Sequence, residues 1–265
     1  MTNPPPLRVL RDGAVATLLL DRPAALNTLD FALMEALPDA LAHLATDADV
    51  RVVIVAGAGR HFMAGGDLRA FAGALDREAD GEVAHFEARI GRLHAAIETL
   101  QRMPQIVIAR AQGAVAGFGL SLLCACDLAI AAEDAYFSAA YRHIGLSPDG
   151  GATFMLPRLV GVRRALEILL LAERFDAATA QAAGIVNRVV PAHLLDATVA
   201  EMAASLVRGP RGALARTKRL VRESLGRTLS AQLAAEASSF AACAAEPDFA
   251  EGLAAFLAKR APAFR

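Results

Sequence analysis

The sequence predicts an α/β protein with parallel strands, followed by a helical region. Short apolar segments of strand length alternate with segments whose apolar residues recur at helical spacing, which is the pattern of β-α-β units. From Leu194 onward only helical patterns remain, with breaks at Gly209-Pro210 and at Pro247. We therefore expect an α/β core over residues 1–195 and a C-terminal helical region over residues 196–265.

The strands are expected where compact apolar runs end at turn-forming residues. Residues 1–12 contain three prolines and predict an irregular lead-in. The first strand then ends at Asp21-Arg22-Pro23, and the second is closed by Gly57-Ala58-Gly59. In chain order the expected strands are Ala14–Leu20, Val50–Ala56, Ile106–Arg110, Asp127–Ala132, Tyr136–Ser138 and Val186–Val190.

The helices are expected where leucine and alanine recur every three or four residues. In Asn27–Leu44 five leucines fall on one stripe, which is the spacing of a buried helix face. A polar helical region is expected over about residues 69–103, and an apolar helix follows the Gly/Ala-rich turn at Gly113. Ala152–Leu171 also has a helical pattern, with interruptions expected at Pro157 and Gly161.

Charge and cysteine content argue against several classes of partner. The 27 basic and 28 acidic residues give a net charge of -1, so nothing in the balance favours nucleic acid or an anionic membrane. Three cysteines without regular spacing are no disulfide framework, and we expect Cys124 and Cys126 to be buried thiols. No pair of Cys or His has the spacing of zinc ligands, so we expect no metal.

The sequence also predicts a cytoplasmic protein without a membrane span. The N-terminus carries prolines and no apolar segment of the kind that a signal peptide needs. The longest apolar run extends from Gly113 to Cys126 and is shorter than the ~20 residues of a spanning helix.

Three glycine-bearing motifs are candidates for the functional site. HFMAGGDL (61–68) suits a turn where the backbone approaches a ligand, and the alternative is an ordinary turn with Asp67 capping the next helix. GAVAGFGLSLLCACD (113–127) places free N–H groups at a helix start, which favours a negative oxygen there. The alternative role of these glycines is to permit close helix packing. The segment matches neither the dinucleotide-binding fingerprint nor the G-x-S-x-G motif of serine hydrolases.

The third motif is GLSPDGG (145–151), which presents one carboxylate on a tight turn. Pro148 precedes Asp149 and two glycines follow it. For an isolated P-D-G-G segment, a turn or capping role of the aspartate is the alternative.

In this order and spacing the three motifs resemble the successive signatures of the crotonase (enoyl-CoA hydratase/isomerase) superfamily. LLLDRPAALNTLD resembles the family's first strand and turn, AAGIVNRVV the segment that closes the core, and FLAKRAPAF the C-terminal helix. The resemblance covers residues 7–264. It implies a spiral of ββα units with a C-terminal helical trimerisation region, and homotrimers that commonly pair into hexamers.

The resemblance further implies an acyl-CoA thioester substrate whose enolate is stabilised by two backbone N–H groups. These groups map to Ala64 and Phe118, and the Phe118 side chain is expected to narrow the site. Coenzyme A enters as part of the substrate, and no other cofactor is implied. Lys259 is a candidate for contacting a CoA phosphate, in its own subunit or in a neighbouring one. Arg22 is a weaker candidate for the same contact. The remaining substrate-binding residues that the resemblance implies are Ala24, Ala25, Leu26, Gly65, Gly66, Asp67, Leu68, Gly117 and Tyr141.

The chain departs from the family pattern at the acid/base positions. Hydratases of the family use two glutamates, and their positions hold Ser121 and Tyr141 here. Neither side chain is a base near neutral pH. Asp149 resembles the aspartate of the dehalogenase and isomerase branches, and GLSPDGG is closer to the isomerases. We expect Asp149 to shuttle a proton, with Phe118, Tyr141 and Phe154 forming an apolar wall around it.

Three other hypotheses stay open from the sequence. Asp149 would be a nucleophile toward an aromatic acyl-CoA in a dehalogenase-like enzyme. The missing glutamates also fit a non-catalytic acyl-CoA binder. A broad description as an enoyl-CoA hydratase would reflect the fold alone and not the reaction. RNA binding has little support, because the basic group from Arg211 to Arg222 fits solvent or a trimer face equally well.

Overall fold

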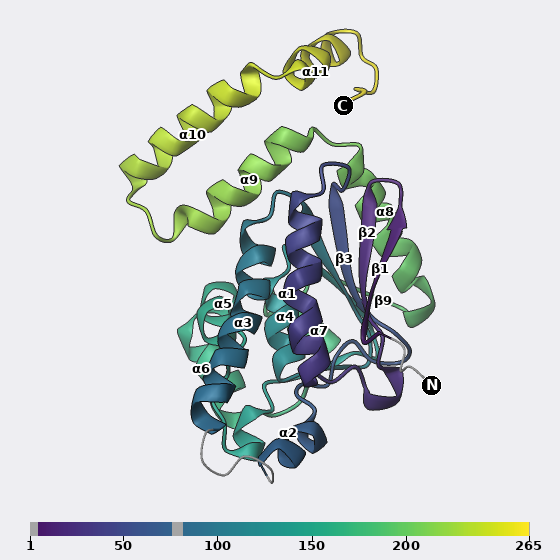
Figure 1. The fold of residues 1–265 in the computed structure, drawn as a ribbon. Coiled ribbons are helices and arrows are strands. Elements are labelled where there is room, and N and C mark those ends of the chain that lie inside the picture. Colours follow the sequence, from purple (N-terminus) through teal and green to yellow (C-terminus); the bar gives the residue numbers. More distant parts are fainter. Residues whose placement is uncertain (1–4, 76–81, 265) are drawn as a thin grey trace.

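The structure, a computed structural model, describes residues 5–75 and 82–264. Within these residues the strands form a six-stranded sheet in the order β1-β2-β3-β4-β6-β9 and a three-stranded sheet in the order β5-β7-β8. Figure 1 labels β1, β2, β3 and β9 of the larger sheet. The strands are β1 Leu7–Asp12, β2 Val15–Leu20, β3 Val52–Gly57, β4 Ile106–Ala111, β5 Ala114–Ala116, β6 Leu128–Ala132, β7 Tyr136–Ser138, β8 Phe175–Asp176 and β9 Arg188–Val190.

Helices follow the strand pairs, and among the described residues after β9 only helices are found. They are η1 Pro23–Ala25, α1 Phe31–Thr46, α2 Leu68–Leu75, α3 Glu82–Arg102, α4 Phe118–Ala125, η2 Tyr141–Ile144, α5 Ala152–Val160, α6 Val162–Leu171, α7 Ala177–Ala182, η3 Ala192–Leu194, α8 Leu195–Val207, α9 Arg211–Ser224, α10 Leu229–Ala244 and α11 Pro247–Leu257. The predicted helical region of 69–103 contains α2 and α3, and residues 76–81 between them lie outside the described residues.

Successive strands pass from one sheet to the other. β4 and β6 lie in the large sheet, while β5 and β7, which follow them directly, lie in the small one. A helix comes after each pair, and the strands from β2 to β9 in the large sheet all run parallel to their neighbours. This arrangement is the predicted spiral of ββα units.

The first strand differs from the sequence prediction. The irregular lead-in expected over residues 1–12 is wrong for residues 7–12, because β1 pairs antiparallel with β2 from Leu7↔Leu20 to Asp12↔Val15. β1 is an edge strand in which only Leu7 is buried, so it lacks the apolar alternation that marks a strand. The hairpin turns at Gly13, whose φ of 56° favours glycine.

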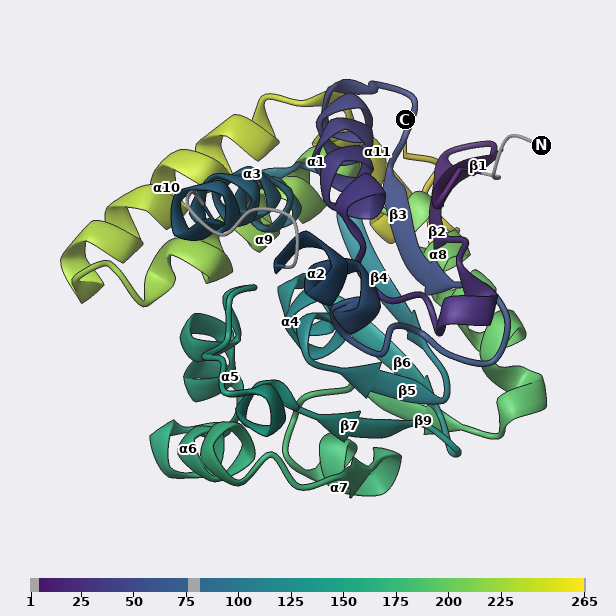
Figure 2. The ribbon, with the colours of Figure 1, turned by 60° about the horizontal axis from the view of Figure 1, so that its bottom comes forward.

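The central strands are buried on both faces. In β3 the side chains of Val53 and Val55 face the larger core with α1, α3 and α4, whereas those of Val52 and Ile54 face a smaller core with α8. A strand covered on both faces carries a continuous apolar run, which is why the sequence signal was strong here. Seen from the end that α2 occupies, α4 lies in the middle of the molecule with α5 beside it (Figure 2).

One helix break in this part differs from the prediction. Ala152–Leu171 divides at Gly161, whose φ is 76°, into α5 and α6. Pro157 lies inside α5 and does not interrupt it.

The C-terminal helices divide into one that covers the sheet and three that extend beyond it. Leu195, Val199 and Ala203 of α8 are buried in the smaller core, so α8, at the start of the predicted helical region, packs as part of the sheet structure. Helices α9, α10 and α11 form an arm at the end of the molecule opposite α2 (Figure 1). We call these three helices the C-terminal arm.

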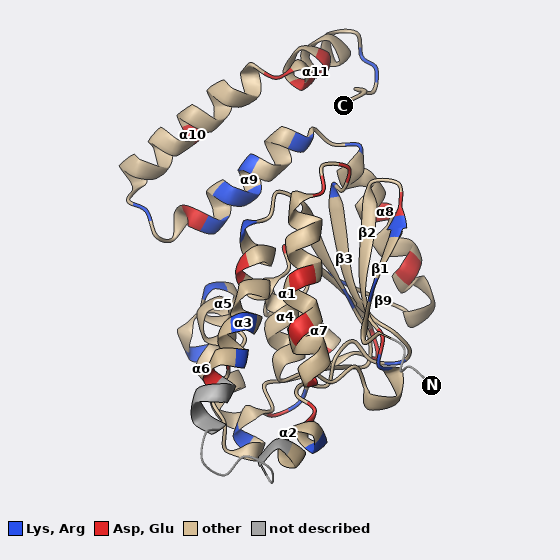
Figure 3. Ribbon diagram, viewed as in Figure 1, with Lys and Arg blue, Asp and Glu red and all other residues tan. Residues whose placement is uncertain are grey.

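A buried ion-pair cluster joins the arm to the core. Lys218 of α9 lies 2.7 Å from Asp127 and donates to the Leu100 and Gln105 carbonyls, and Arg222 lies 2.8 Å from the same carboxylate. Burial lowers the pKa of Lys218, while the Asp127 charge opposes that shift. Figure 3 shows Lys and Arg side by side along α9, and much of this basic group is used in contacts within the chain.

Candidate active site

Two turns meet beside the carboxyl ends of β2 and β3. The Leu29 N–H donates to the Gly65 carbonyl at 2.8 Å, and the Asp67 N–H donates to the Leu29 carbonyl at 2.9 Å. The two segments predicted to bind CoA, Ala24–Leu26 and Ala64–Leu68, therefore lie side by side. Leu26 and Leu68 expose their side chains to solvent.

Asn27 holds the first of these turns from inside. Its side chain is fully buried, and its φ of 55° is one that asparagine tolerates better than most residues. The amide nitrogen donates to the Ala58 carbonyl at 2.9 Å and to the His61 carbonyl at 2.7 Å, while the amide oxygen accepts from the Arg22 N–H at 2.9 Å. One side chain thus fixes the turn after β2 against the loop after β3.

Arg22 and Asp67 tie the two turns together at the surface. The Arg22 guanidinium lies 2.9 Å from Asp67 and 3.1 Å from Asp30. Burial alone would raise the pKa of Asp67, but the hydrogen bond from Arg22, the Ala70 N–H and the Arg22 charge outweigh it and lower the pKa. Asp67 therefore has the capping role named as its alternative, and the Arg22 cation is already paired with two carboxylates.

The second turn touches the start of α4. Gly117 has a φ of 52°, and a Cβ placed on it would lie 3.2 Å from the Cα of Gly65. Its N–H donates to the Ser138 carbonyl at 3.0 Å, which fixes the turn on β7. Two glycines without side chains permit this close approach of two backbones.

One of the two backbone N–H groups at this approach differs from the prediction, and Phe118 is kept. The Ala64 N–H already donates to the Leu26 carbonyl at 3.1 Å, which contradicts its predicted role as an open donor. In the described part of the chain, the N–H groups of Gly66 and Phe118 have no acceptor. Each follows one of the two touching glycines, Gly65 and Gly117, and Phe118 begins α4, where the helix dipole is positive.

Asp149 lies next to the start of α4 because Gly150 packs on it. A Cβ on Gly150 would lie 2.6 Å from Ser121 Cβ and 2.7 Å from Phe118 Cδ2, so only glycine allows this contact. His94 of α3 holds the same loop by donating from Nε2 to the Asp149 carbonyl at 2.6 Å. Sequence reasoning missed His94, since nothing in its helical context distinguishes it.

The Asp149 carboxylate accepts a hydrogen bond from a buried tyrosine. The Tyr141 hydroxyl donates to Asp149 Oδ1 at 2.7 Å, and Ser121 Oγ lies 3.4 Å from the Tyr141 oxygen. Burial raises the pKa of Tyr141, and the Asp149 charge adds to that shift. The two positions that hold glutamates in hydratases are thus joined to Asp149 in one hydroxyl chain.

The predicted wall residues lie in different places. The Phe118 ring is buried in the larger core and packs on Gly150, the residue after Asp149. Phe154 is 57 % exposed and lies under the Arg158 guanidinium on the outer side of α5, so it forms no wall around Asp149. Of the three, Tyr141 alone contacts the carboxylate.

Lys259 lies apart from these residues within one chain. It is exposed, has a φ of 52° and follows α11, the last helix of the arm. The turn that carries it is fixed by Glu251, which accepts two hydrogen bonds from Arg260, at 2.6 and 2.8 Å, and one from the Ala263 N–H at 2.7 Å.

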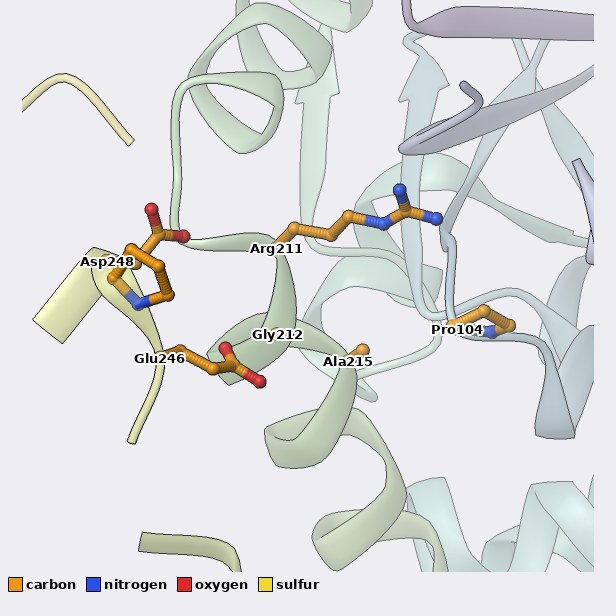
Figure 4. A pocket seen from close by; sticks show the side chains of 7 residues that line it. Pro104, Arg211, Gly212, Ala215, Glu246 and Asp248 are labelled. Atoms are coloured by element: carbon orange, nitrogen blue, oxygen red, sulfur yellow. The ribbon is translucent and has the colours of Figure 1, made fainter. Parts of the chain in front are cut away.

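A separate cavity of about 420 Å³ lies between α9 and the start of α11 (Figure 4). Arg211, Gly212 and Glu246 line it, and Glu246 is paired with Arg216 at 2.7 Å. It shares no lining residue with the turns around Asp149.

Comparison with known proteins identifies the family. A model of the family described as enoyl-CoA hydratase/isomerase matches residues 11–265. The chain belongs to the enoyl-CoA hydratase/isomerase family.

Relatives within the enoyl-CoA hydratase/isomerase family carry both activities in their names. The chain is 36 % identical to the 2,3-dehydroadipyl-CoA hydratase of Escherichia coli, covering 98 % of both chains. It is 33 % identical to the 1,2-epoxyphenylacetyl-CoA isomerase of the same organism, covering 96 % of this chain and 95 % of that one. An enoyl-CoA hydratase structure from Polaromonas sp. JS666 superposes with a TM-score of 0.90 at 36 % identity, covering 98 % and 99 %.

The family membership confirms the predicted crotonase-like fold and an acyl-CoA hydratase/isomerase function. Among the described residues, no helix is both long and apolar enough to cross a membrane. Within the same residues, His, Cys, Asp and Glu side chains form no group of three that would hold a metal ion. Cys124 and Cys126 are free and buried, as predicted.

Proposed function

We propose that this enzyme shifts the double bond of an enoyl-CoA thioester, with Asp149 as the single acid/base. The observation that carries the proposal is the set of groups around the start of α4. One carboxylate lies there beside two hydroxyls, in the place where hydratases of the family hold two glutamates. A double-bond shift needs one group that removes a proton and returns it to another carbon.

The backbone supplies the electrostatic part of the proposed reaction. When Asp149 removes a proton, the electron pair moves onto the thioester oxygen. We assign the oxyanion hole to the N–H groups of Gly66 and Phe118, because Ala64 has donated its own to Leu26. Pre-aimed donors of this kind are typically worth about 3 kcal/mol each in the transition state. The proton then returns to a different carbon, so the reaction consumes no water and no cofactor.

The CoA part of the substrate is assigned to the two turns that lie side by side. Ala24, Ala25 and Leu26 would contact it from the first turn, and Gly65 and Leu68 from the second. Because Lys259 lies at the end of the arm, its proposed phosphate contact would come from a neighbouring copy in a trimer or hexamer. Its exposed ammonium is available for such a contact.

Hydration by the two-glutamate mechanism is not supported by this site. Ser121 is fully buried, and burial raises the pKa of Tyr141 beyond the range in which it would act as a base. Neither side chain supplies the second carboxylate that positions and activates water.

The decisive variant is Asp149→Asn, assayed on 3-enoyl-CoA thioesters with CoA binding measured in parallel. Asparagine keeps the shape and removes the base, so kcat should fall by about 100- to 10,000-fold while CoA binding is kept. Unchanged isomerisation in this variant would overturn the proposal.

The same experiment separates the alternatives. A covalent adduct trapped on Asp149 of the wild type, without isomerisation, would favour the nucleophilic mechanism on an aromatic acyl-CoA. Binding without turnover in both proteins, over aliphatic and aromatic 3-enoyl thioesters, would favour a non-catalytic acyl-CoA binder.

A further inference from the structure

From the hydrogen bonds around Asp149 we infer that Tyr141 is a positioning residue, which holds one carboxylate oxygen of Asp149 so that the other oxygen carries the proton. This inference rests on the proposed function, in which Asp149 is the acid/base. It adds a residue at a position where the chain lacks the glutamate of the hydratases.

The direction of the hydroxyl chain follows from the number of protons. Tyr141 has one hydroxyl proton, and a carboxylate is a pure acceptor, so this proton lies on the 2.7 Å contact to Asp149 Oδ1. The Tyr141 oxygen is then an acceptor for the Ser121 hydroxyl, 3.4 Å away. The chain therefore runs one way, from Ser121 through Tyr141 to Asp149.

Burial keeps this direction fixed. Tyr141 is 8 % exposed and Ser121 is fully buried, so water does not compete for either hydroxyl. Because burial and the Asp149 charge both raise the pKa of Tyr141, it stays protonated over the pH range in which the enzyme would work. A neutral hydroxyl of this kind donates steadily and never competes with Asp149 for the substrate proton.

The two oxygens of Asp149 then have different tasks. Oδ1 is occupied by Tyr141, whereas Oδ2 receives no hydrogen bond from the part of the chain that the structure describes. The backbone of the same residue is fixed by His94, and Gly150 is packed against Phe118. With both ends of the residue held, Oδ2 alone would remove the proton and return it on the same face of the substrate.

The test is Tyr141→Phe, with Tyr136→Phe as a matched control, since these are the two tyrosines of the chain. Tyr136 lies on β7, and its ring packs under the Arg174 guanidinium. Tyr141→Phe should lower kcat by about 10- to 100-fold with little change in KM, because a misplaced catalytic group loses rate and not binding. Tyr136→Phe should keep the wild-type kcat.

The split between kcat and KM is the readout that a purely structural role would not give. A loosened fold should raise KM while kcat falls, whereas a misplaced carboxylate lowers kcat alone. A wild-type kcat in Tyr141→Phe would overturn the inference.

A second variant guards against a loss caused by misfolding. Tyr141→Phe leaves the buried Ser121 hydroxyl without its acceptor. The double variant, Tyr141→Phe with Ser121→Ala, removes this unpaired hydroxyl as well. The double variant should recover thermal stability and remain as slow as the single one. Recovery of kcat together with stability would show that Tyr141 matters for the fold alone. Loss of activity in Asp149→Asn with none in Tyr141→Phe would reject this inference and leave the proposed function intact.

Discussion

At the scale of single residues, the site replaces a pair of carboxylates by one carboxylate and two hydroxyls. Two carboxylates in one small site repel each other, and one of them tends to hold a proton. The Tyr141 hydroxyl brings no second charge and donates a hydrogen bond to Asp149. Under the proposed function, this difference would favour proton transfer between carbons over the addition of water.

Asn27 gives a stability prediction at this scale. Asn27→Ala removes three buried hydrogen bonds and leaves the Ala58 and His61 carbonyls without their donor. Since each buried polar group left unsatisfied costs about 1–3 kcal/mol, the free energy of unfolding should fall by about 3 kcal/mol in urea titrations. Asn187→Ala is the matched control, because this exposed side chain accepts one bond from the Ala129 N–H and should cost about 1 kcal/mol. Equal losses in the two variants would contradict the role assigned to Asn27.

The residues of the site were predictable to different degrees. Asp149 and the touching glycines stand in motifs that the sequence shows directly. The donor at Ala64 was predicted wrongly, because its N–H is taken by Leu26, a contact across the chain that no local pattern reveals. The bond between Tyr141 and Asp149 was missed for the same reason, although each residue had been singled out.

At the scale of secondary structure elements, burial decided which strands the sequence could show. β3 and β4 are covered on both faces and stand out as apolar runs. β1, β5 and β8 lie at sheet edges, and all three were missed; β1 and β8 have few buried residues, and β5 has only three residues. Burial also sets the boundary between the core and the arm. Because α8 packs on the sheet, this boundary lies between α8 and α9, after the predicted one at residue 195.

The turn after α11 gives a prediction on pH. The hydrogen bonds from Arg260 and from the Ala263 N–H lower the pKa of Glu251 from 4.5 to about 2. A carboxyl whose pKa is lower in the folded state stabilises the fold above its unfolded pKa. This contribution should therefore be complete above about pH 4.5 and lost as the pH falls toward 2.

Carbon-detected NMR titration of the Glu251 carboxyl would measure this shift. Arg260→Gln is the informative variant, since it removes the first cause and should return the midpoint toward that of an ordinary glutamate. A wild-type midpoint near 4.5 would show that the contacts of Glu251 with Arg260 do not persist in solution.

At the scale of the whole molecule, the C-terminal arm carries large apolar side chains that one chain leaves uncovered. Phe240 of α10 is 73 % exposed and Phe256 of α11 is 81 % exposed, and leucines of both helices are exposed as well. A soluble monomer rarely leaves this many large apolar side chains in water on neighbouring helices, so the arm is a predicted interaction surface. The resemblance to a family of trimers predicts that a second copy of the chain covers it.

Light scattering should therefore give three or six times the 27.7 kDa mass of one chain. Phe240→Asp should lower that mass, because it places a charge in the predicted interface. Val162→Asp is the control, since Val162 is 64 % exposed on α6, outside the arm. A wild-type protein with the mass of a single chain would rule out the predicted assembly, and with it the Lys259 contact from a neighbouring copy.

The uncovered face of the arm has a consequence for how the protein behaves when it is scarce. If its phenylalanines are covered only by another copy, dilution removes part of the surface burial that holds the arm. A newly made chain would then finish folding only after it meets its partners, and until then its apolar face is open to chaperones and to aggregation. The concentration of this protein would thus be one of the conditions that keep it folded.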